Sequence, residues 1–559
     1  MRKVLVVFGS LGLCVWGSWL AGQALYAWFG FDGAQAGIGT WWRYAVHWQH
    51  AALQSHQTAI VGSGLVGAVP VAVAIGLWGM GYWKKRTPSL HGDARFATLA
   101  ELRQAGLCQS GTAGVLLGRV GKQYLRDHGQ RFVLLAAPTR SGKGVGVVIP
   151  VLLDYAHSVV VLDIKQENHH ITSGYRQALG QSVYVFNPFA ASGQSHRWNP
   201  LRYIASTSAQ RVQDLRAMAH MLYPDGDNTG NHAFFIEHAR NVFVALCLYL
   251  FESYALQQQC APERAQYPTM GALYRLALGQ GQDTRQYFVH LMEEDHLSER
   301  CRQAFAGFVS QAPETLAGIM GTFQAPIMAW GDPIVDAATS GDDFLLTDVR
   351  KRPMSIYLCV APNQLQQAAR VFNLFFAQLV HENTKVLPSQ DTGLRYQCLL
   401  LMDEFTTLGA VDILAHSVGY MAGYNLRLLP VIQSMAQLES TYGKERARNF
   451  ATNHATHILF APREQEDAQT YSEMLGYTTV QRKQTTHGKE KSHTQVLERR
   501  ALLLPQELKA MGAEQEIIFM EGLAHPARVR KIRYYQEPWF KGKLLPATKV
   551  PTLTLRKQI

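Results

Sequence analysis

The sequence has few cysteines, and their arrangement suggests neither a disulfide framework nor a zinc site. The seven cysteines lie far apart, are odd in number and form no CxxC pair. Disulfide-stabilised secreted domains and zinc-binding modules are therefore excluded, and we expect reduced thiols in a cytosolic setting. The sequence also shows no internal repeat of fixed period, so a repeat architecture is not indicated.

Aspartate, glutamate, lysine and arginine are missing from two long stretches near the N-terminus. One lies between Lys3 and Asp32 and the other is AIVGSGLVGAVPVAVAIGLWGMGYW (59–83). Each is long enough to cross a bilayer. We therefore predict two membrane spans, about 4–29 and 59–83. Basic residues precede the first span and follow the second, at 84–86. The positive-inside rule then places both termini in the cytoplasm. A cleaved signal peptide is the alternative for the first stretch, although its apolar part is long and no clean cleavage site follows.

The rest of the chain is long and only mildly basic. Its 559 residues exceed what one hydrophobic core usually organises, so we expect two or three folded units. The formal net charge of +11 is compatible with nucleic-acid binding but does not by itself indicate it.

Eight apolar runs of strand length follow the second charge-free stretch, and helix-like segments separate them. Each run is continuous rather than alternating, which is typical of strands buried on both faces. This order predicts an α/β protein with a mostly parallel sheet. The runs are 132–137, 158–165, 182–188, 355–362, 398–404, 426–433, 457–462 and 516–520.

The stretch 206–325 has almost no strand signal and many helical spacings, as in EHARNVFVALCLYLFESYALQ. We interpret it as an all-α domain inserted between two parts of a nucleotide-binding domain, 87–205 and 326–559, after a membrane anchor at 1–86. An insertion that folds by itself costs little loop-closure free energy. The polar, basic segment 481–500 lacks periodicity, and we interpret it as a solvated loop; a loop that contacts DNA phosphates is the alternative.

The main chemical signal lies in LLAAPTRSGKGVGVVIP (134–150). This segment has the strand, tight turn, Gly-Lys pair and helix start of a phosphate-binding loop. Lys143 supplies charge for the β- and γ-phosphates, and Gly142 lets backbone N–H groups approach them. The segment departs from GxxxxGK[ST], because Ala137 replaces the first glycine and Gly144 replaces a metal-contacting hydroxyl. A glycine-rich turn that binds no nucleotide is the alternative.

Polar residues end two later strands. In CLLLMDEFTTLG (398–409), Asp403 and Glu404 follow an apolar run, and buried carboxylates are costly unless a cation or a reaction uses them. In phosphate-loop NTPases such an Asp binds Mg²⁺ and the following Glu polarises the attacking water. Gln433 ends the next run and is suited to sense the γ-phosphate. An acidic surface turn and a structural glutamine are the alternatives.

With these residues in place, the sequence resembles the TraG-like type IV coupling proteins, the membrane-anchored ATPases of conjugation and type IV secretion. The resemblance covers nearly the whole chain, and the family accepts the TRSGKG form with glycine after the lysine. The segments that carry it, besides the two charge-free stretches, include HGDARFAT (91–98), APTRSGKGVGVVIP (137–150), VVVLDIKQE (159–167), VFNPF (185–189), RWNPL (197–201), LLLMDEFTTLG (399–409) and VIQSMAQLESTYG (431–443).

The resemblance implies a RecA/FtsK-like nucleotide-binding domain that assembles as a hexamer at the bacterial inner membrane. Family members recruit a relaxase–DNA complex or protein effectors and couple ATP hydrolysis to passage into the secretion channel. Lys143, Glu404 and Gln433 match the catalytic positions, and Asp403 matches the Mg²⁺ ligand. The nucleotide-binding loop comprises Ala137, Pro138, Thr139, Arg140, Ser141, Gly142, Lys143, Gly144 and Val145.

Some features stay open at the level of sequence. A hexamer needs an arginine from the adjacent subunit, and Arg427, Arg448 and Arg140 are unproven candidates. We expect single- or double-stranded DNA to bind without sequence preference. Nothing in the inserted segment shows whether the cargo is DNA, protein or both. Two other functions are compatible with the motifs: an FtsK-like double-stranded DNA translocase, and a membrane scaffold that recruits secretion substrates without hydrolysing ATP.

Overall fold

The computed structural model describes residues 2–83, 90–225, 230–487 and 491–555. The chain forms two compact units. The first unit comprises 1–93 and 479–499, and the second comprises 94–478 and 500–559. The basic residues at 84–86, which support the predicted membrane orientation, lie outside the described residues.

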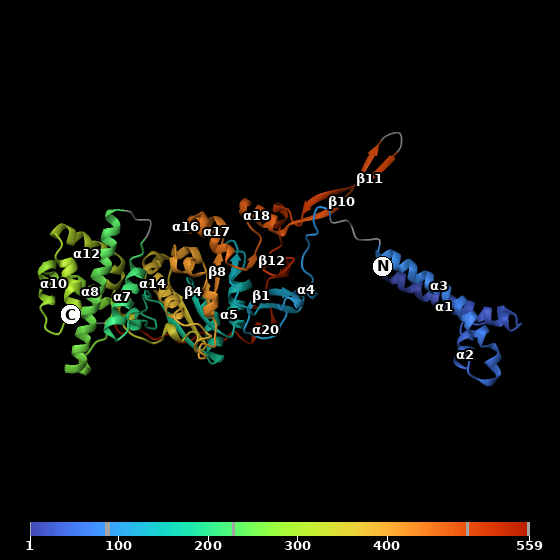
Figure 1. The fold of residues 1–559 in the computed structure, drawn as a ribbon, viewed down its shortest axis with the longest axis horizontal. Helices are drawn as coiled ribbons and strands as arrows, with labels where there is room; N and C mark the ends of the chain where they lie inside the picture. Colours follow the sequence, from blue (N-terminus) through green and yellow to red (C-terminus); the bar gives the residue numbers. More distant parts are fainter. Residues whose placement is uncertain (1, 84–89, 226–229, 488–490, 556–559) are drawn as a thin grey trace. The chain divides into compact units, whose positions relative to one another are not determined.

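Both charge-free stretches of the first unit form helices. Helix α1 (Arg2–Trp28) lies beside α3 (Gln57–Trp83), and the short helix α2 (Thr40–Val46) stands in the connection between them (Figure 1). The two long helices approach closely at Gly17 and Gly67. A Cβ atom on Gly17 would lie 2.4 Å from the Gly67 carbonyl oxygen, and one on Gly67 would lie 2.5 Å from the Gly17 carbonyl oxygen. Small residues at such a contact are typical of helix pairs that pack without large side chains.

The second unit is built on an eleven-stranded mixed sheet with the order β2-β1-β13-β12-β9-β3-β8-β7-β4-β6-β5. Seven neighbouring strands, from β9 to β5, are parallel, and the other four extend the sheet in antiparallel pairs. The strands are β1 (Val115–Val120), β2 (Gln123–Asp127), β3 (Val133–Ala136), β4 (Ser158–Asp163), β5 (Ser182–Phe186), β6 (Met354–Cys359), β7 (Cys398–Met402), β8 (Leu426–Ile432), β9 (Thr456–Leu459), β12 (Gln515–Met520) and β13 (Ala527–Arg530).

All eight apolar runs form strands of this sheet, so the predicted α/β fold with a mostly parallel sheet is confirmed. Strand β3 shows why the runs are continuous. Leu134 packs in the core on one face of the sheet, and Leu135 packs in the core on the other face. A strand with helices on both faces buries every side chain, so its apolar residues do not alternate with polar ones.

Helices cover both faces of the sheet. Residues of α5 and α6 belong to the same core as Leu135, whereas residues of α14 belong to the core of Leu134. The helices outside the inserted segment are α4 (Leu99–Gln104), α5 (Ile149–Asp154), α6 (Glu167–Ala178), α14 (Leu365–Asn383), α15 (Asp412–Ser417), α16 (Met435–Tyr442), α17 (Lys444–Thr452), α18 (Gln465–Leu475), α19 (Pro505–Lys509) and α20 (Pro538–Lys541).

Seven α-helices and no strand occupy the described residues between β5 and β6. Figure 1 shows α8, α10 and α12 gathered at one end of the second unit. The predicted boundary at 325 falls inside α12, and helices continue to Ala338. The seven are α7 (Ser208–Leu222), α8 (Asn231–Cys260), α9 (Met270–Ala277), α10 (Thr284–Met292), α11 (Glu299–Val309), α12 (Pro313–Ile327) and α13 (Pro333–Ala338).

Two helical stretches among the described residues are long and apolar enough to span a membrane, Ala51–Val73 and His232–Cys260. The second lies in α8, whose buried residues Val242, Phe243 and Leu246 belong to the core shared with the sheet. We therefore interpret α8 as a core helix of the second unit.

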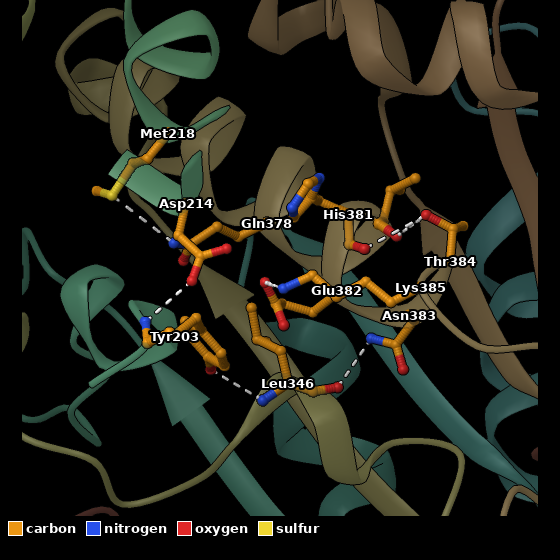
Figure 2. A network of polar contacts seen from close by, with 12 residues as sticks. Tyr203, Asp214, Met218, Leu346, Gln378, His381, Glu382, Asn383, Thr384 and Lys385 are labelled. Carbon is orange, nitrogen blue, oxygen red and sulfur yellow. Dashed lines mark hydrogen bonds and ion pairs between the residues drawn. The ribbon is translucent and has the colours of Figure 1, made fainter. Parts of the chain in front are cut away.

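Helix α14 ties the inserted helices to the sheet through buried amides. The Gln378 side chain donates a hydrogen bond to the Pro200 carbonyl at 2.6 Å and lies 3.9 Å from the Met218 sulfur of α7. Further along α14, the Asn383 amide donates to the Leu346 carbonyl at 2.9 Å, and the Leu346 N–H donates to the Tyr203 hydroxyl at 2.9 Å (Figure 2). Helix α14 thus makes polar contacts with the chain on both sides of the inserted helices and contacts α7 itself through Met218.

The interpretation of 481–500 as an irregular loop is wrong. Its described residues belong to β10 (Tyr477–His487) and β11 (Lys491–Ala501), which form a two-stranded sheet separate from the main one. The segment is mostly polar and lacks the period-two pattern of a half-buried strand, so no strand was predicted there.

Two helical glycines give a test of the packing of the C-terminal segment. Gly174 lies in α6, where a Cβ atom would stand 2.0 Å from the Pro546 carbonyl oxygen; Gly321 lies in α12 with no atom within 4 Å of the same position. We expect Gly174→Ala to destabilise the full-length protein in detergent by about 1–3 kcal/mol. Gly321→Ala should stabilise it by about 0.5–1 kcal/mol. Thermal unfolding measures both, and equal shifts would contradict this packing.

Candidate nucleotide-binding site

The predicted phosphate loop joins the buried strand β3 to a helical turn at Gly144–Val148 that leads into α5. Ala137 is fully buried, and its N–H donates to the Ile432 carbonyl at 2.9 Å. Among the described non-glycine residues, those with positive φ are Arg140, Gln166, Glu404 and Asn425. Ala137 therefore has ordinary backbone geometry, and the alanine in place of glycine carries no conformational penalty.

The turn of the loop uses left-handed backbone at two positions. Arg140 has a φ of 57° and Gly142 has a φ of 85°. Glycine adopts this conformation freely, whereas at Arg140 it is uncommon for a side chain and typical of constrained functional turns. The Arg140 side chain is exposed. At Gly144 a Cβ atom would meet nothing within 4 Å, so the missing hydroxyl does not result from a lack of space.

Three strand ends converge on this loop, because β3, β8 and β7 are parallel neighbours. Lys143 Nζ lies 2.6 Å from Glu404 Oε1 and 3.8 Å from Asp403 Oδ1. Gln433, directly after β8, donates from Nε2 to Glu404 Oε2 at 3.0 Å. The four residues predicted from separate motifs thus form one connected cluster. Glu404 stands at its centre, in left-handed backbone with a φ of 60°.

The two carboxylates differ in their electrostatics. Burial raises the pKa of Asp403, and the nearby charge of Lys143 opposes this only in part. Burial also acts to raise the pKa of Glu404, but the hydrogen bond and charge of Lys143 outweigh it, so this pKa lies below its ordinary value. Glu404 is therefore the carboxylate that stays ionised most readily, as a proton acceptor must.

The cluster has few metal ligands, and those present fit Mg²⁺. Among the described residues no group of three or more His, Cys, Asp or Glu side chains could hold an ion. Apart from Lys143, the buried oxygen Oδ1 of Asp403 has no partner, and the buried hydroxyl of Ser141 makes no hydrogen bond. One carboxylate with a free oxygen suits Mg²⁺, which usually takes one or two protein carboxylates together with phosphate oxygens and water.

The sequence model of the type IV secretory system conjugative DNA transfer family matches residues 96–557. The chain belongs to this family. Two VirD4 proteins are similar to it. That of Rhizobium rhizogenes is 32% identical over 462 residues, which cover 80% of this chain and 66% of the relative. That of Agrobacterium fabrum is 30% identical over 542 residues, which cover 94% and 78%. The resemblance to TraG-like coupling proteins is thereby confirmed.

A TraG protein is also similar to this chain over most of its length. A conjugal transfer protein TraG of Escherichia coli is 27% identical over 522 residues, covering 83% of this chain and 80% of the relative. The chain spans about two thirds to four fifths of the length of these three relatives.

Solved structures of the coupling protein TrwB share the fold. An unbound form has a TM-score of 0.56 at 16% identity and covers 82% of this chain and 98% of its own. A complex of TrwB with the ATP analogue ADPNP has a TM-score of 0.55 at 14% identity, with the same coverage. A further TrwB structure contains ADP and Mg²⁺ and has a TM-score of 0.55. Because the sequence identities to TrwB are this low, the structural similarity establishes the fold of this protein and nothing more.

One of the three arginine candidates is excluded by its position. The Arg427 side chain is fully buried, lies 3.4 Å from Asp127 Oδ2 and donates to the Arg131 carbonyl at 2.9 Å. It cannot reach a neighbouring subunit, so the prediction that Arg427 acts there is wrong: the residue holds β8 to the chain before β3. Arg448 on α17 and Arg140 in the loop are exposed and stay predictions.

Sequence reasoning missed two residues beside Asp403. Asp163 ends β4 and accepts the His169 N–H at 2.7 Å, and burial raises its pKa to about 7. Asn168, in the first turn of α6, is buried and its N–H donates to Asp163 at 3.4 Å; it lies near enough to Asp403 to lower the pKa of that carboxyl. The run VVVLD was a usable signal for Asp163, since it also ends a buried strand on a carboxylate. Asn168 had none.

The structural role of Arg427 can be tested against Arg448. Arg427→Gln removes the buried donor to the Asp127 and Arg131 carbonyls, while Asp127 keeps its ion pair with Arg131, and should destabilise the protein by about 1–3 kcal/mol. Arg448→Gln removes an exposed side chain and should change stability by about 0.5 kcal/mol or less. Thermal unfolding without nucleotide is the measurement. An unchanged midpoint for Arg427→Gln would mean that the buried contact contributes nothing to the fold.

Proposed function

We propose that this family member is an ATPase that recruits a relaxase–DNA complex, protein effectors or both, and couples ATP hydrolysis to their transfer into a type IV secretion channel. The observation that carries the proposal is the cluster of Lys143, Glu404 and Gln433 at the carboxyl ends of β3, β7 and β8. The TrwB structures with ADPNP and with ADP and Mg²⁺ support it, because they have the same fold.

The geometry suggests how the residues divide the work. When the β- and γ-phosphates of ATP enter the loop, Lys143 exchanges Glu404 for phosphate oxygens, since both compete for the same ammonium group. Glu404 keeps the hydrogen bond from Gln433 and is then free to accept a proton from the attacking water. Gln433 follows β8, the strand next to the loop, and its side chain contacts the proton acceptor Glu404. This position suits a sensor of the γ-phosphate.

Asp403 is the residue that would hold Mg²⁺. The ion, when bound, supplies positive charge between the phosphate oxygens. With Gly144 after the lysine, no hydroxyl follows Lys143, so Asp403, together with phosphate oxygens and water, would hold the ion.

We further propose that the protein is anchored in the bacterial inner membrane by two spans, with both termini cytoplasmic, and works as a homohexamer. The close contact of α1 and α3 at Gly17 and Gly67 supports a paired membrane anchor. Arg448 and Arg140 are both exposed, so either is available to supply the arginine that a hexamer needs from the adjacent subunit. DNA would bind through its phosphates, without sequence preference.

Hydrolysis can be separated from binding with two variants. Lys143→Ala should abolish binding of a fluorescent ATP analogue, because the charge for the β- and γ-phosphates is lost. Glu404→Gln should bind the analogue but hydrolyse ATP about 10²–10⁴-fold more slowly, because the proton acceptor is lost. Steady-state phosphate release by the full-length protein in detergent, with and without single-stranded DNA, measures the second effect.

The same assay distinguishes the competing functions. Equally slow hydrolysis by the wild type and both variants would support a scaffold that recruits substrates without using ATP. ATP-driven movement along naked double-stranded DNA would instead support an FtsK-like translocase. Unchanged thermal unfolding of the variants is the control for folding.

DNA binding is a separate prediction, because it rests on charge rather than on the ATP site. Affinity for single-stranded DNA should fall steeply with salt, by about a thousandfold between 50 and 200 mM if several phosphates are contacted. It should not differ between unrelated sequences of equal length. Fluorescence anisotropy of labelled oligonucleotides measures both. Sequence-selective binding that resists salt would contradict this mode of recognition.

A further inference from the structure

A buried lysine far from the motifs contacts the phosphate loop. Lys531 follows β13 and is only 7% exposed. Its Nζ donates to the Ser141 carbonyl at 3.2 Å and lies 3.4 Å from the ring centre of Phe460. Phe460 is fully buried after β9, where its N–H donates to the Ala136 carbonyl at 3.0 Å. The ammonium group therefore sits between an aromatic face and the backbone of the loop.

The helical turn after the loop is packed onto the same place. At Gly146 a Cβ atom would lie 3.4 Å from Phe460 and 3.7 Å from the Lys531 Cβ. The backbone of Lys531 is also fixed, because its N–H donates to the Glu514 carbonyl at 2.9 Å. Lys531 is thus held by Glu514 at its main chain and by Phe460 at its side chain, and neither of these two contacts involves the loop.

The contact controls a peptide plane. In a trans peptide the carbonyl of one residue and the N–H of the next point in opposite directions. A phosphate loop binds its ligand with backbone N–H groups that point inward. When Lys531 holds the Ser141 carbonyl outward, the N–H of Gly142 is turned toward the opposite side. Gly142 has a φ of 85°, a conformation that a free glycine leaves easily.

Lys531 lies within electrostatic reach of a buried carboxyl group, Glu516. Glu516 in β12 is fully buried, and burial raises its pKa to about 8. Burial lowers the pKa of Lys531, also to about 8, against the opposing effect of Glu516 and Glu514. Burial thus disfavours the charged form of both groups, and the contact of Lys531 with the Ser141 carbonyl is the observation that links it to the loop.

We propose that Lys531 is a positioning residue for nucleotide binding, which holds the Ser141–Gly142 peptide so that the Gly142 N–H faces the phosphates. The proposal rests on the proposed function, since it assumes that the loop binds a nucleoside di- or triphosphate. Lys143 contacts the phosphates, whereas Lys531 acts through the backbone of the loop.

The test uses full-length protein in detergent and a fluorescent ADP derivative as the probe. Lys531→Met should raise the Kd of the probe about tenfold to a hundredfold, the range expected for a lost hydrogen bond to a charged group. Lys531→Arg, which keeps a charged donor, should restore much of the affinity. In steady-state hydrolysis the Met variant should show a raised KM and a nearly unchanged kcat, because Lys531 does not contact the reacting atoms. Lys541→Met is the matched control, since Lys541 is exposed on α20.

A second measurement needs no nucleotide. Arg140 is exposed in the loop, and trypsin cleaves after it only when the loop leaves its fixed conformation. We expect faster cleavage at Arg140 in Lys531→Met than in the wild type, at an unchanged unfolding midpoint. If Lys531→Met fails to fold, Phe460→Leu is the alternative test. It removes the aromatic ring that the Lys531 ammonium group contacts and should raise the Kd of the probe by a few-fold.

The outcomes separate the two proposals. Tight probe binding by both the wild type and Lys531→Met, with equal cleavage at Arg140, would overturn the role of Lys531 and leave the proposed function intact. No probe binding by the wild type would overturn the proposed function and with it the role of Lys531. A lower unfolding midpoint with an unchanged Kd would make Lys531 a residue of the core only.

Discussion

The parallel pairing of β3, β8 and β7 is the constraint on which the candidate site depends. Ala136 pairs with Ile432, and Met402 pairs with Pro430, so the three strands end at nearly the same level of the sheet. The residues that follow these strands therefore lie at the same edge of the sheet. The chain places a phosphate loop, two carboxylates and an amide at these ends, although Lys143 precedes Asp403 by 260 residues and Glu404 precedes Gln433 by 29.

Much of this arrangement is readable from the sequence, because burial and chemistry point to the same residues. A strand covered by helices on both faces must be apolar throughout, so the eight runs were visible without alternation. A polar residue that ends such a run stands at the edge of the sheet by necessity, which made Asp403, Glu404 and Gln433 predictable. The same rule applied to Asp163 and was not used there. The sequence pattern does not predict distances between side chains, such as the 2.6 Å between Lys143 Nζ and Glu404 Oε1.

Other features were hidden, because their signal lies in partners far away in the chain. Arg427 looked like any arginine near a motif, and only the buried Asp127 shows that it is structural. The strands β1, β2 and β13 are interrupted by charged residues, such as Arg119, Arg126 and Arg528, so they contain no continuous apolar run. The ribbon of β10 and β11 is mostly polar and shows no alternation. Lys531 sits in a basic stretch at the chain's end, where nothing in the spacing links it to the loop.

The balance of charge explains why these hidden residues matter. Lys143 stands between Asp403 and Glu404 and compensates Glu404 much better than Asp403, so one carboxylate oxygen stays without a partner. The phosphates of a nucleotide would add negative charge and draw Lys143 away from both carboxylates. Positive charge must then come from groups that the motifs do not contain. In the proposed function Asp403 would bring in a cation, and Lys531 contacts the backbone of the loop without taking part in the cluster. On this proposal the loop works with glycine after its lysine, because a residue far along the chain helps to fix its backbone.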